Sequence, residues 1–275
     1  MTVVVKIGGA RAVEPEGALD DVADLVDDGT DVVVVHGGST AVDDMLERLG
    51  MEPDYVETPD GVVGRFTDAE TMAVFSMVFG KVNQDLVTRL QNLGRDAVGL
   101  SGVDGRLLSG PRKSAVRVVE NGKRKIRRGD HSGRIESVND ELLRLHLDAD
   151  YTPVVSVPML ADDGTAVNSD ADRAAAAVAG ALDAELVLLT DVTGVYTDPE
   201  APETRIDTVD SPSAASELEE AAEGFMRRKV MAAFEALETG AARVVIGDAN
   251  ASKPVQEALA GAGTTIYPEA LDVES

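Results

Sequence analysis

Residues 2–9, TVVVKIGG, form a run of β-branched residues broken only by Lys6, and the run ends in a glycine pair. Residues 31–38, DVVVVHGG, show the same pattern. Such a run is typical of a strand buried on both faces of a parallel sheet, because these strands do not alternate polar and apolar residues. The two runs therefore predict an α/β fold with a central, mainly parallel sheet.

Beyond these two strands, apolar runs of strand length alternate with helical periods along the chain. This alternation predicts helices on both faces of the sheet, that is, a three-layer αβα sandwich. Residues 67–93 are expected to be helical, with a break near Gly80. Residues 102–138 differ, because glycines, turn residues and short alternating strands predict an excursion of antiparallel β-hairpins. We expect residues 1–160 to form an N-terminal lobe and residues 161–275 a C-terminal lobe, sharing one continuous sheet.

The chain is strongly acidic. It has 50 acidic and 25 basic residues among 275, for a net charge of -25. Such a surface repels nucleic acid backbones and anionic lipid, so we expect neither nucleic acid nor membrane as a partner. Because the Debye length falls to about 3 Å at 1 M salt, the charge indicates a molar-salt cytoplasm, as in a halophilic archaeon. An acidic protein from a mesophile is the alternative.

Cysteine and export signals are both missing from the sequence. With no cysteine, disulfides and thiolate metal sites are excluded. The chain starts directly on a strand without a basic and apolar leader, and its apolar stretches are too short to span a bilayer. We therefore expect a cytoplasmic protein.

Glycine pairs follow the first two predicted strands, at Gly8-Gly9 and at Gly37-Gly38. Ligands bind at the carboxyl ends of parallel strands. Glycine lets backbone N–H groups approach an anion closely, and the following helix N-terminus adds positive potential. Tight βα turns are the structural alternative. Lys6, on a buried strand, also needs an anionic partner, so together these features indicate an anion-binding site.

A second polar group opens the helix predicted after residue 168. Asn168, Asp170 and Asp172 stand within five positions, and an N-cap needs only one of them. A second role for this group is therefore expected. The histidines lack metal-ligand spacing, so we expect no metal held by the protein, and His36 is interpreted as a packed residue rather than a catalyst.

The ordered set of motifs resembles the amino acid kinase family, in particular its acetylglutamate kinase branch. The matching segments are VKIGGA, VHGGS, GRFTDAET, AVGLSG, PVVSVP, NSDADRAAAA, LLTDVTGVYTD and MRRKVMAA. They occur in family order over nearly the whole chain. The resemblance implies phosphorylation of a carboxylate by ATP, with Mg²⁺ carried by the nucleotide. It also implies that the carboxylate substrate binds the N-terminal half and ATP the C-terminal half.

The resemblance also implies roles for individual residues. Lys6 and Lys229 are expected to contact the transferring phosphoryl group, with Asp172 orienting both lysines. The residues expected to bind the substrate are Gly37, Gly38, Ser39, Arg65 and Asn168. The residues expected to bind the nucleotide are Gly8, Gly9, Asp191, Val192, Thr193, Gly194, Val195 and Tyr196. Ser39 departs from acetylglutamate kinases, which usually carry a third glycine at this position.

The predicted excursion carries a concentration of positive charge. Between Arg106 and Arg134 ten residues are basic and two, Glu120 and Asp130, are acidic. A solvated run of charge is the alternative, but a lone basic patch on an acidic protein steers an acidic partner. The residues expected to form this basic patch for an acidic partner are Arg112, Lys113, Arg117, Lys123, Arg124, Lys125, Arg127 and Arg128.

Residues 99–123, GLSGVDGRLLSGPRKSAVRVVENGK, look like the subfamily that acts on glutamate or aminoadipate attached to a small acidic amino-group carrier protein of the LysW type. Those kinases serve arginine or lysine biosynthesis, and Ser39 also resembles them. We favour this substrate over free N-acetylglutamate. A non-catalytic sensor of an amino acid or nucleotide is disfavoured, because Lys6, Asp172 and Lys229 are all present. A homodimer is the family expectation.

Overall fold

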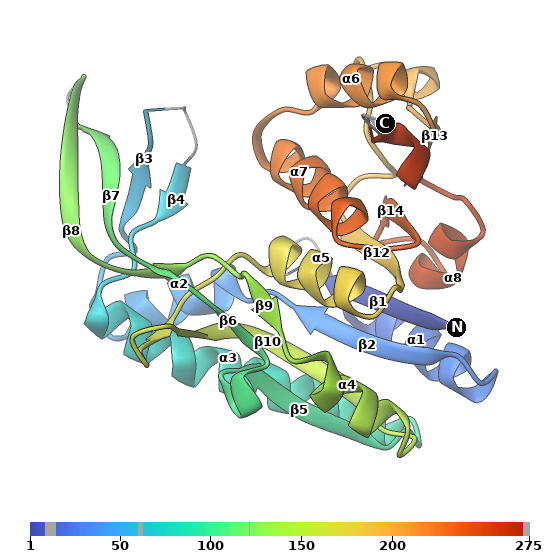
Figure 1. Ribbon diagram of the computed structural model, residues 1–275, viewed down its shortest axis with the longest axis horizontal. Helices are drawn as coiled ribbons and strands as arrows, with labels where there is room; N and C mark the ends of the chain where they lie inside the picture. The colour runs from blue at the N-terminus through green and yellow to red at the C-terminus, as the bar shows by residue number, and fades with distance from the viewer. Residues whose placement is uncertain (9–14, 60–62, 121, 272–275) are drawn as a thin grey trace.

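The computed structural model describes residues 1–8, 15–59, 63–120 and 122–271 and confirms the α/β fold with a mainly parallel central sheet (Figure 1). The strands are β1 (Thr2–Ile7), β2 (Asp31–His36), β3 (Tyr55–Glu57), β4 (Val63–Arg65), β5 (Ala97–Gly102), β6 (Leu108–Gly110), β7 (Arg112–Glu120), β8 (Lys123–Gly133), β9 (Ser137–Val138), β10 (Thr152–Ala161), β11 (Ala166–Val167), β12 (Glu185–Thr190), β13 (Thr208–Val209), β14 (Arg243–Asp248) and β15 (Thr264–Ile266). The α-helices are α1 (Pro15–Asp27), α2 (Ser39–Arg48), α3 (Ala69–Asn92), α4 (Asp140–Leu147), α5 (Ala171–Ala181), α6 (Pro212–Ala221), α7 (Gly224–Glu238) and α8 (Pro254–Leu259).

The main sheet contains strands from both halves of the sequence. Its order is β13-β15-β14-β12-β1-β2-β10-β6-β9, with β5 and β11 also paired to β10. The first strand lies inside the sheet, parallel to β2 on one side and to β12 on the other. Because β10 and β14 continue the parallel run, the carboxyl ends of these strands share one edge of the sheet. This edge collects the polar residues that follow each strand.

The β-branched strand β1 is buried on both faces, as its sequence predicted. Val4 packs into the core on one side of the sheet, and Val3 and Val5 pack into the core on the other. The first core receives side chains from α2, α3, α5 and α7. The second receives side chains from α1, α8 and the end of α3. The helices therefore cover both faces of the sheet.

Helix α3 is continuous, so the break predicted near Gly80 is wrong. A methyl group added at Gly80 would have no heavy atom within 4 Å, which places this glycine on the open side of the helix. The opposite side buries Phe75, Val78 and Phe79 against the sheet. The packing of this apolar face offsets the weak helix propensity of one glycine.

The excursion of antiparallel hairpins predicted within residues 102–138 is confirmed. Strands β7 and β8 form a separate two-stranded sheet, and β6 and β9 return to the edge of the main sheet. The β7–β8 hairpin stands beside the β3–β4 hairpin at one end of the molecule (Figure 1). Arg127 joins the two hairpin regions, because it pairs with Asp54 and lies 4.0 Å above the ring of Phe66.

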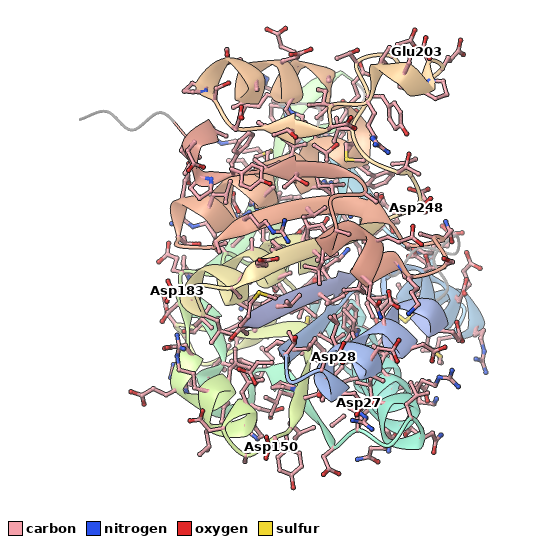
Figure 2. All side chains as sticks on the ribbon, turned by 90° about the vertical axis from the view of Figure 1, so that its right-hand side faces the viewer. Asp27, Asp28, Asp150, Asp183, Glu203 and Asp248 are labelled. Carbon is pink, nitrogen blue, oxygen red and sulfur yellow. The ribbon has the colours of Figure 1, made fainter. Side chains whose placement is uncertain are left out.

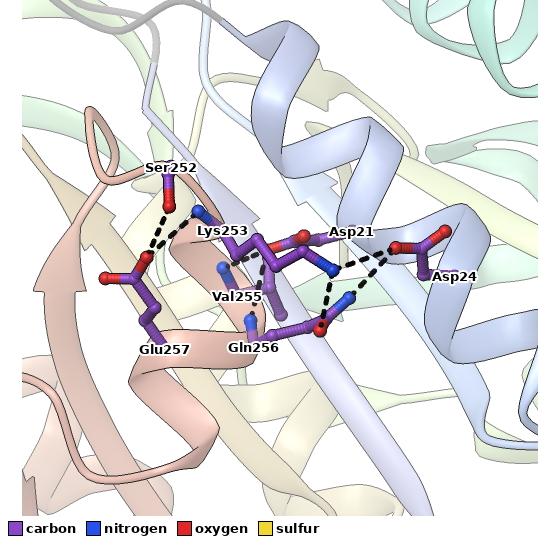
Figure 3. Close-up of polar contacts among 7 residues, drawn as sticks. All are labelled: Asp21, Asp24, Ser252, Lys253, Val255, Gln256 and Glu257. Carbon is purple, nitrogen blue, oxygen red and sulfur yellow. Dashed lines mark hydrogen bonds and ion pairs between the residues drawn. The ribbon is translucent and has the colours of Figure 1, made fainter.

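A residue of the first helix, α1, caps the N-terminus of the last α-helix, α8 (Figure 3). The carboxylate of Asp21, buried in α1, accepts hydrogen bonds from the backbone N–H groups of Val255 (2.8 Å) and Gln256 (3.1 Å) at the start of α8. Lys253, the residue before α8, makes no side-chain cap of its own. Asp21 therefore caps a helix more than 230 residues away in sequence.

Acidic side chains are spread over the surface (Figure 2). Those labelled in that view are Asp27, Asp28, Asp150, Asp183, Glu203 and Asp248. They come from turns, from the short 3₁₀ helix Pro202–Thr204 and from element ends in both halves of the chain. In the part of the chain that the structure describes, no helix combines the length and the apolar character needed to cross a bilayer.

Candidate active site

Two lysines from opposite ends of the sequence meet at one carboxylate. The Nζ of Lys6, near the end of β1, lies 2.6 Å from Oδ1 of Asp172 in the first turn of α5. The Nζ of Lys229, in α7, lies 3.2 Å from Oδ2 and 3.3 Å from Oδ1 of the same carboxylate. The three side chains are only 7%, 12% and 12% exposed for Lys6, Asp172 and Lys229. The structure therefore brings together the three residues predicted to act on the phosphoryl group.

The charges of this triad are unbalanced. Burial alone would raise the pKa of Asp172, but the charges of Lys6 and Lys229 and their hydrogen bonds outweigh it and hold that pKa far below its usual value. Burial lowers the pKa of Lys229, and the charge of Lys6 lowers it further, against the attraction of Asp172. Two ammonium groups share one carboxylate, which leaves an excess positive charge. A buried excess charge of this kind favours an anionic ligand.

The three polar residues at the start of α5 have three different partners. Asp170 is the N-cap, because its carboxylate accepts hydrogen bonds from the N–H groups of Asp172 and Arg173. Asp172 instead faces the two lysines. Asn168 donates from its side-chain amide to the hydroxyl of Thr67, at 3.2 Å. The second role expected for this group is therefore present in the geometry.

The predicted substrate residues Ser39 and Arg65 are in contact. The Nη2 of Arg65 donates to the backbone carbonyl of Ser39 at 3.0 Å and to the hydroxyl of Tyr55 at 3.0 Å. Its Nη1 pairs with Asp43, and the Tyr55 hydroxyl donates to the same carboxylate at 2.9 Å. Arg65 is thus held rigidly beside the start of α2. Asn168 reaches this region through Thr67, two residues after Arg65.

Asp43 and Tyr55 were not predicted from the sequence. One signal for Asp43 was present: it stands four residues after Ser39 in α2, so both lie on the same face of the helix. Tyr55 carried no comparable signal, because its contact with Arg65 depends on the pairing of β3 with β4. That pairing places Tyr55 directly opposite Arg65.

The second glycine pair lies against the first strand. Gly37 donates its N–H to the carbonyl of Ile7 at 3.0 Å, and Gly38 is the N-cap residue of α2. A methyl group at Gly38 would lie 3.2 Å from the ring of Phe79, so a glycine lets the backbone pack tightly there. Gly8 lies directly after β1. Gly9, predicted to bind the nucleotide, lies outside the described residues.

The residues predicted to bind the nucleotide follow β12 at the shared sheet edge. Of Asp191–Tyr196, Thr193 lines a pocket of about 300 Å³. The other residues that line this pocket are Arg205, Asp248, Ala251, Pro254, Glu257, Ala258 and Ala262. The side chain of Val195, in contrast, is buried in the core.

The turn at Gly194 requires glycine. Its φ is 150°, and an added Cβ would lie 2.8 Å from the hydroxyl of Thr264 and 2.9 Å from Cδ of Arg205. Arg205 and Asp248 were not predicted to line the pocket. Asp248 had a detectable signal, since it directly follows the apolar run VVIG at residues 244–247, and polar residues after such a run lie at the carboxyl edge of a parallel sheet. Arg205 lies in a loop-rich stretch whose path only the folded chain defines.

The basic hairpin β7–β8 divides its charges into two groups. Arg112 and Arg127 are partly buried and bonded within the chain, Arg112 to the carbonyl of Asp130 and Arg127 to Asp54. The exposed members are Lys113, Arg117, Lys123, Arg124, Lys125 and Arg128. Arg117, Arg124 and Lys125 line a hollow of about 550 Å³ together with Thr58, Pro59, Val116 and Ile126. This surface therefore combines positive charge with one exposed apolar side chain, Ile126, and with the partly buried Val116 and Pro59.

Within residues 1–8, 15–59, 63–120 and 122–271, histidine and carboxylate side chains form no group of three or more that is placed to hold a metal ion.

Several known proteins are similar to this chain over most of its length. The model of the amino acid kinase family matches residues 1–248. A LysW-aminoadipate kinase from Deinococcus radiodurans is 45% identical over 266 residues, covering 96% of this chain and 91% of that protein. A LysW-aminoadipate/LysW-glutamate kinase from Saccharolobus solfataricus is 36% identical over 269 residues, covering 96% and 98%. N-acetylglutamate synthase from Neisseria gonorrhoeae has a similar structure, with a TM-score of 0.75 and 26% identity. That match covers 98% of this chain but only 60% of the synthase.

Proposed function

Because this chain belongs to the amino acid kinase family, we propose that it phosphorylates the side-chain carboxylate of glutamate or 2-aminoadipate held on a small acidic carrier protein. The chain is an ATP-dependent phosphotransferase with a carboxyl group as acceptor, and the product is an acyl phosphate for arginine or lysine biosynthesis. The observation that carries this proposal is the convergence of Lys6 and Lys229 on Asp172.

The chemistry needs no general base. A substrate carboxylate with a pKa of about 4.3 is ionised at neutral pH. One of its oxygens forms a bond to the γ-phosphorus of ATP while the bond to the bridging oxygen breaks, and ADP leaves with that electron pair. The main barrier is the approach of one anion to another, so catalysis depends on positioning and on positive charge.

The residues of the site divide these tasks. Lys6 and Lys229 are proposed to neutralise the transferring phosphoryl group, each as a mobile point charge. Asp172 is proposed to orient both ammonium groups, which its short contacts support. Arg65 is held by Asp43 and the Ser39 carbonyl, and it is proposed to bind the substrate carboxylate through the N–H groups that these contacts leave over. Thr193 and Arg205 support a nucleotide position beside the sheet edge.

Magnesium is proposed to enter with the nucleotide and to neutralise part of its phosphate charge when bound. The composition of the triad agrees with magnesium being held by the nucleotide. Its only carboxylate, Asp172, is already paired with the ammonium groups of Lys6 and Lys229. A site of this composition suits phosphate oxygens better than a divalent cation.

The basic hairpin supports a carrier-bound substrate rather than a free one. The chain as a whole has a net charge of -25, whereas the β7–β8 hairpin exposes six basic side chains. This complements an acidic carrier, and electrostatic complementarity gives both speed and selectivity of association. The two similar kinases described above are named for LysW-bound substrates.

The direct test compares substrates in an ATP-consumption assay with hydroxylamine trapping of the acyl phosphate. The expected result is trapped product from carrier loaded with glutamate or aminoadipate, and little from free N-acetylglutamate. Equal or greater rates on free N-acetylglutamate would identify a free acetylglutamate kinase instead. Nucleotide binding without any trapped product would identify a sensor.

A homodimer and a high-salt cytoplasm are parts of the same proposal. Family membership supports the dimer, and the acidic surface supports the high-salt setting (Figure 2). Light scattering at several KCl concentrations examines both, since it gives the mass in solution and shows the salt range in which the protein stays unaggregated.

A further inference from the structure

A buried histidine stands directly before the second glycine pair. His36 ends β2 and is 1% exposed. Its Nδ1 lies 2.9 Å from the carbonyl oxygen of Gly37, and its Nε2 lies 3.2 Å from Nδ2 of Asn83 in α3. Both ring nitrogens therefore have a polar partner inside the protein.

These contacts determine which ring nitrogen carries the proton. The side-chain Nδ2 of Asn83 also lies 2.8 Å from the carbonyl oxygen of Val154, and only an N–H group can donate to that oxygen. The second hydrogen of the same amide points to Nε2 of His36, so Nε2 must accept. The proton is then on Nδ1, from which it is donated to the Gly37 carbonyl.

The surroundings hold Asn83 and His36 in this arrangement. A methyl group at Gly99 would lie 2.1 Å from Oδ1 of Asn83, so glycine at this position leaves room for the amide. The imidazole stacks on Phe79 at 5.7 Å between ring centroids. Burial lowers the pKa of His36 to about 4, against the hydrogen bond to Gly37 and with help from the charge of Lys6. The ring is therefore neutral at pH 7.

The imidazole thereby orients a backbone donor. In a planar trans peptide the C=O and N–H groups point in opposite directions, so a fixed Gly37 carbonyl fixes the Gly38 N–H on the other side. No described residue accepts from this N–H, which is one of the open donors at the start of α2. The sheet register places His36 opposite Ile7, next to Lys6.

We propose that His36 is a positioning residue for phosphoryl transfer, which holds the Gly37 carbonyl through its Nδ1–H and so aims the Gly38 N–H at the phosphoryl group between Lys6 and Lys229. Asn83 selects the tautomer that makes this possible. The role rests on the proposed function, since it needs a transferring anion at the site.

A matched pair of variants separates the hydrogen bond from packing. Asn and Leu have similar shapes, and His36→Asn keeps an N–H donor near the place of Nδ1, whereas His36→Leu has none. We expect kcat of His36→Leu to lie at least about tenfold below that of His36→Asn, because a misaligned backbone donor weakens transition-state binding. KM for ATP is expected to agree within about threefold between the two variants. Equal kcat values in two folded variants would overturn the role.

A spectroscopic measurement on the unmodified protein is independent of activity. Histidine is labelled with ¹⁵N, and the resonances of His36 are identified as those that are missing from the spectrum of His36→Asn. In the unmodified protein at pH 7, these resonances are expected to show a protonated Nδ1 and an unprotonated Nε2. A ring protonated on Nε2, or on both nitrogens, would overturn the inference even if His36→Leu failed to fold. A parent protein without phosphoryl transfer would instead reject the proposed function, so the two failures are distinguishable.

Discussion

Arg228 of helix α7 donates a hydrogen bond to the backbone carbonyl of Val63 in the β3–β4 hairpin, across 165 positions of sequence. Arg228 directly precedes Lys229, and Val63 stands two residues before Arg65. The bond therefore joins the segment that carries a proposed phosphoryl-contacting lysine to the segment that carries the proposed substrate-binding arginine. The two sides of the site are linked outside the triad itself.

Removing this link is expected to weaken substrate binding more than folding. For Arg228→Ala we expect KM for the carboxylate substrate to rise about fivefold, because an exposed bond of this type contributes about 1 kcal/mol. The melting temperature is expected to change little. Arg227→Ala, on the neighbouring exposed position of the same helix, is the control. Identical KM values for the two variants would show that the hairpin is positioned without Arg228.

Lys6→Ala removes one of the two lysine ammonium groups that are proposed to contact the transferring phosphoryl group. We expect kcat to fall by about 100-fold or more, as for loss of a donor that stabilises the transition state. The dissociation constant for ATP, measured by calorimetry, is expected to change much less, since Lys229 remains. A variant as active as the parent would contradict the assignment of Lys6.

The alkaline limb of the pH profile is expected to report on Lys229. Burial and Lys6 lower the pKa of Lys229 below its usual 10.5, although Asp172 and Asp170 oppose the shift. As pH rises through this lowered pKa, the site loses a positive charge and kcat/KM falls. Lys229→Arg is expected to be slower but to lack this limb, because arginine stays protonated. An unchanged limb in Lys229→Arg would assign the titration to another group.

The cap formed by Asp21 is expected to matter for stability and not for chemistry. Asp21→Ala removes the carboxylate oxygen that accepts two N–H groups at α8, and we expect a loss of about 1 kcal/mol in unfolding free energy. Asp24→Ala is the matched control, since Asp24 lies one turn away and makes an exposed ion pair with Lys253 at 3.5 Å (Figure 3). Its effect is expected to stay within about 0.5 kcal/mol. Denaturant unfolding that gave equal losses would refute a special role for Asp21.

The basic hairpin is expected to control the use of carrier-bound substrate. In the double variant Arg117→Glu/Arg124→Glu, both changes lie at the hollow beside β3–β4 and reverse its charge. We expect kcat/KM for loaded carrier to fall at least about tenfold, with most of the loss in association rate. Lys81→Glu, on an exposed position of α3, changes charge outside the hairpin and serves as the control. Equal losses in both variants would indicate a general charge effect instead of docking.

Local patterns were sufficient for the sheet and for part of the site. The strands β1 and β2 were predictable because burial on both faces demands a continuous apolar run. The cluster from Asn168 to Asp172 was predictable as having more than one role, because one helix needs one cap. The break at Gly80 was wrong, since helix propensity is a local quantity and the packing of α3 on the sheet overrides it.

By itself the sequence determined the order of strands and helices, the sign and location of charge, and the types of residue at each strand end. Periodicity and composition are properties of neighbouring residues, so they can be read along the chain. Only the tertiary structure decided that Asp172 stands between Lys6 and Lys229, that Asp43 and Tyr55 hold Arg65, and that Asn83 sets the proton on His36. These pairings join residues from separate elements, and their distances depend on how the helices pack across the sheet.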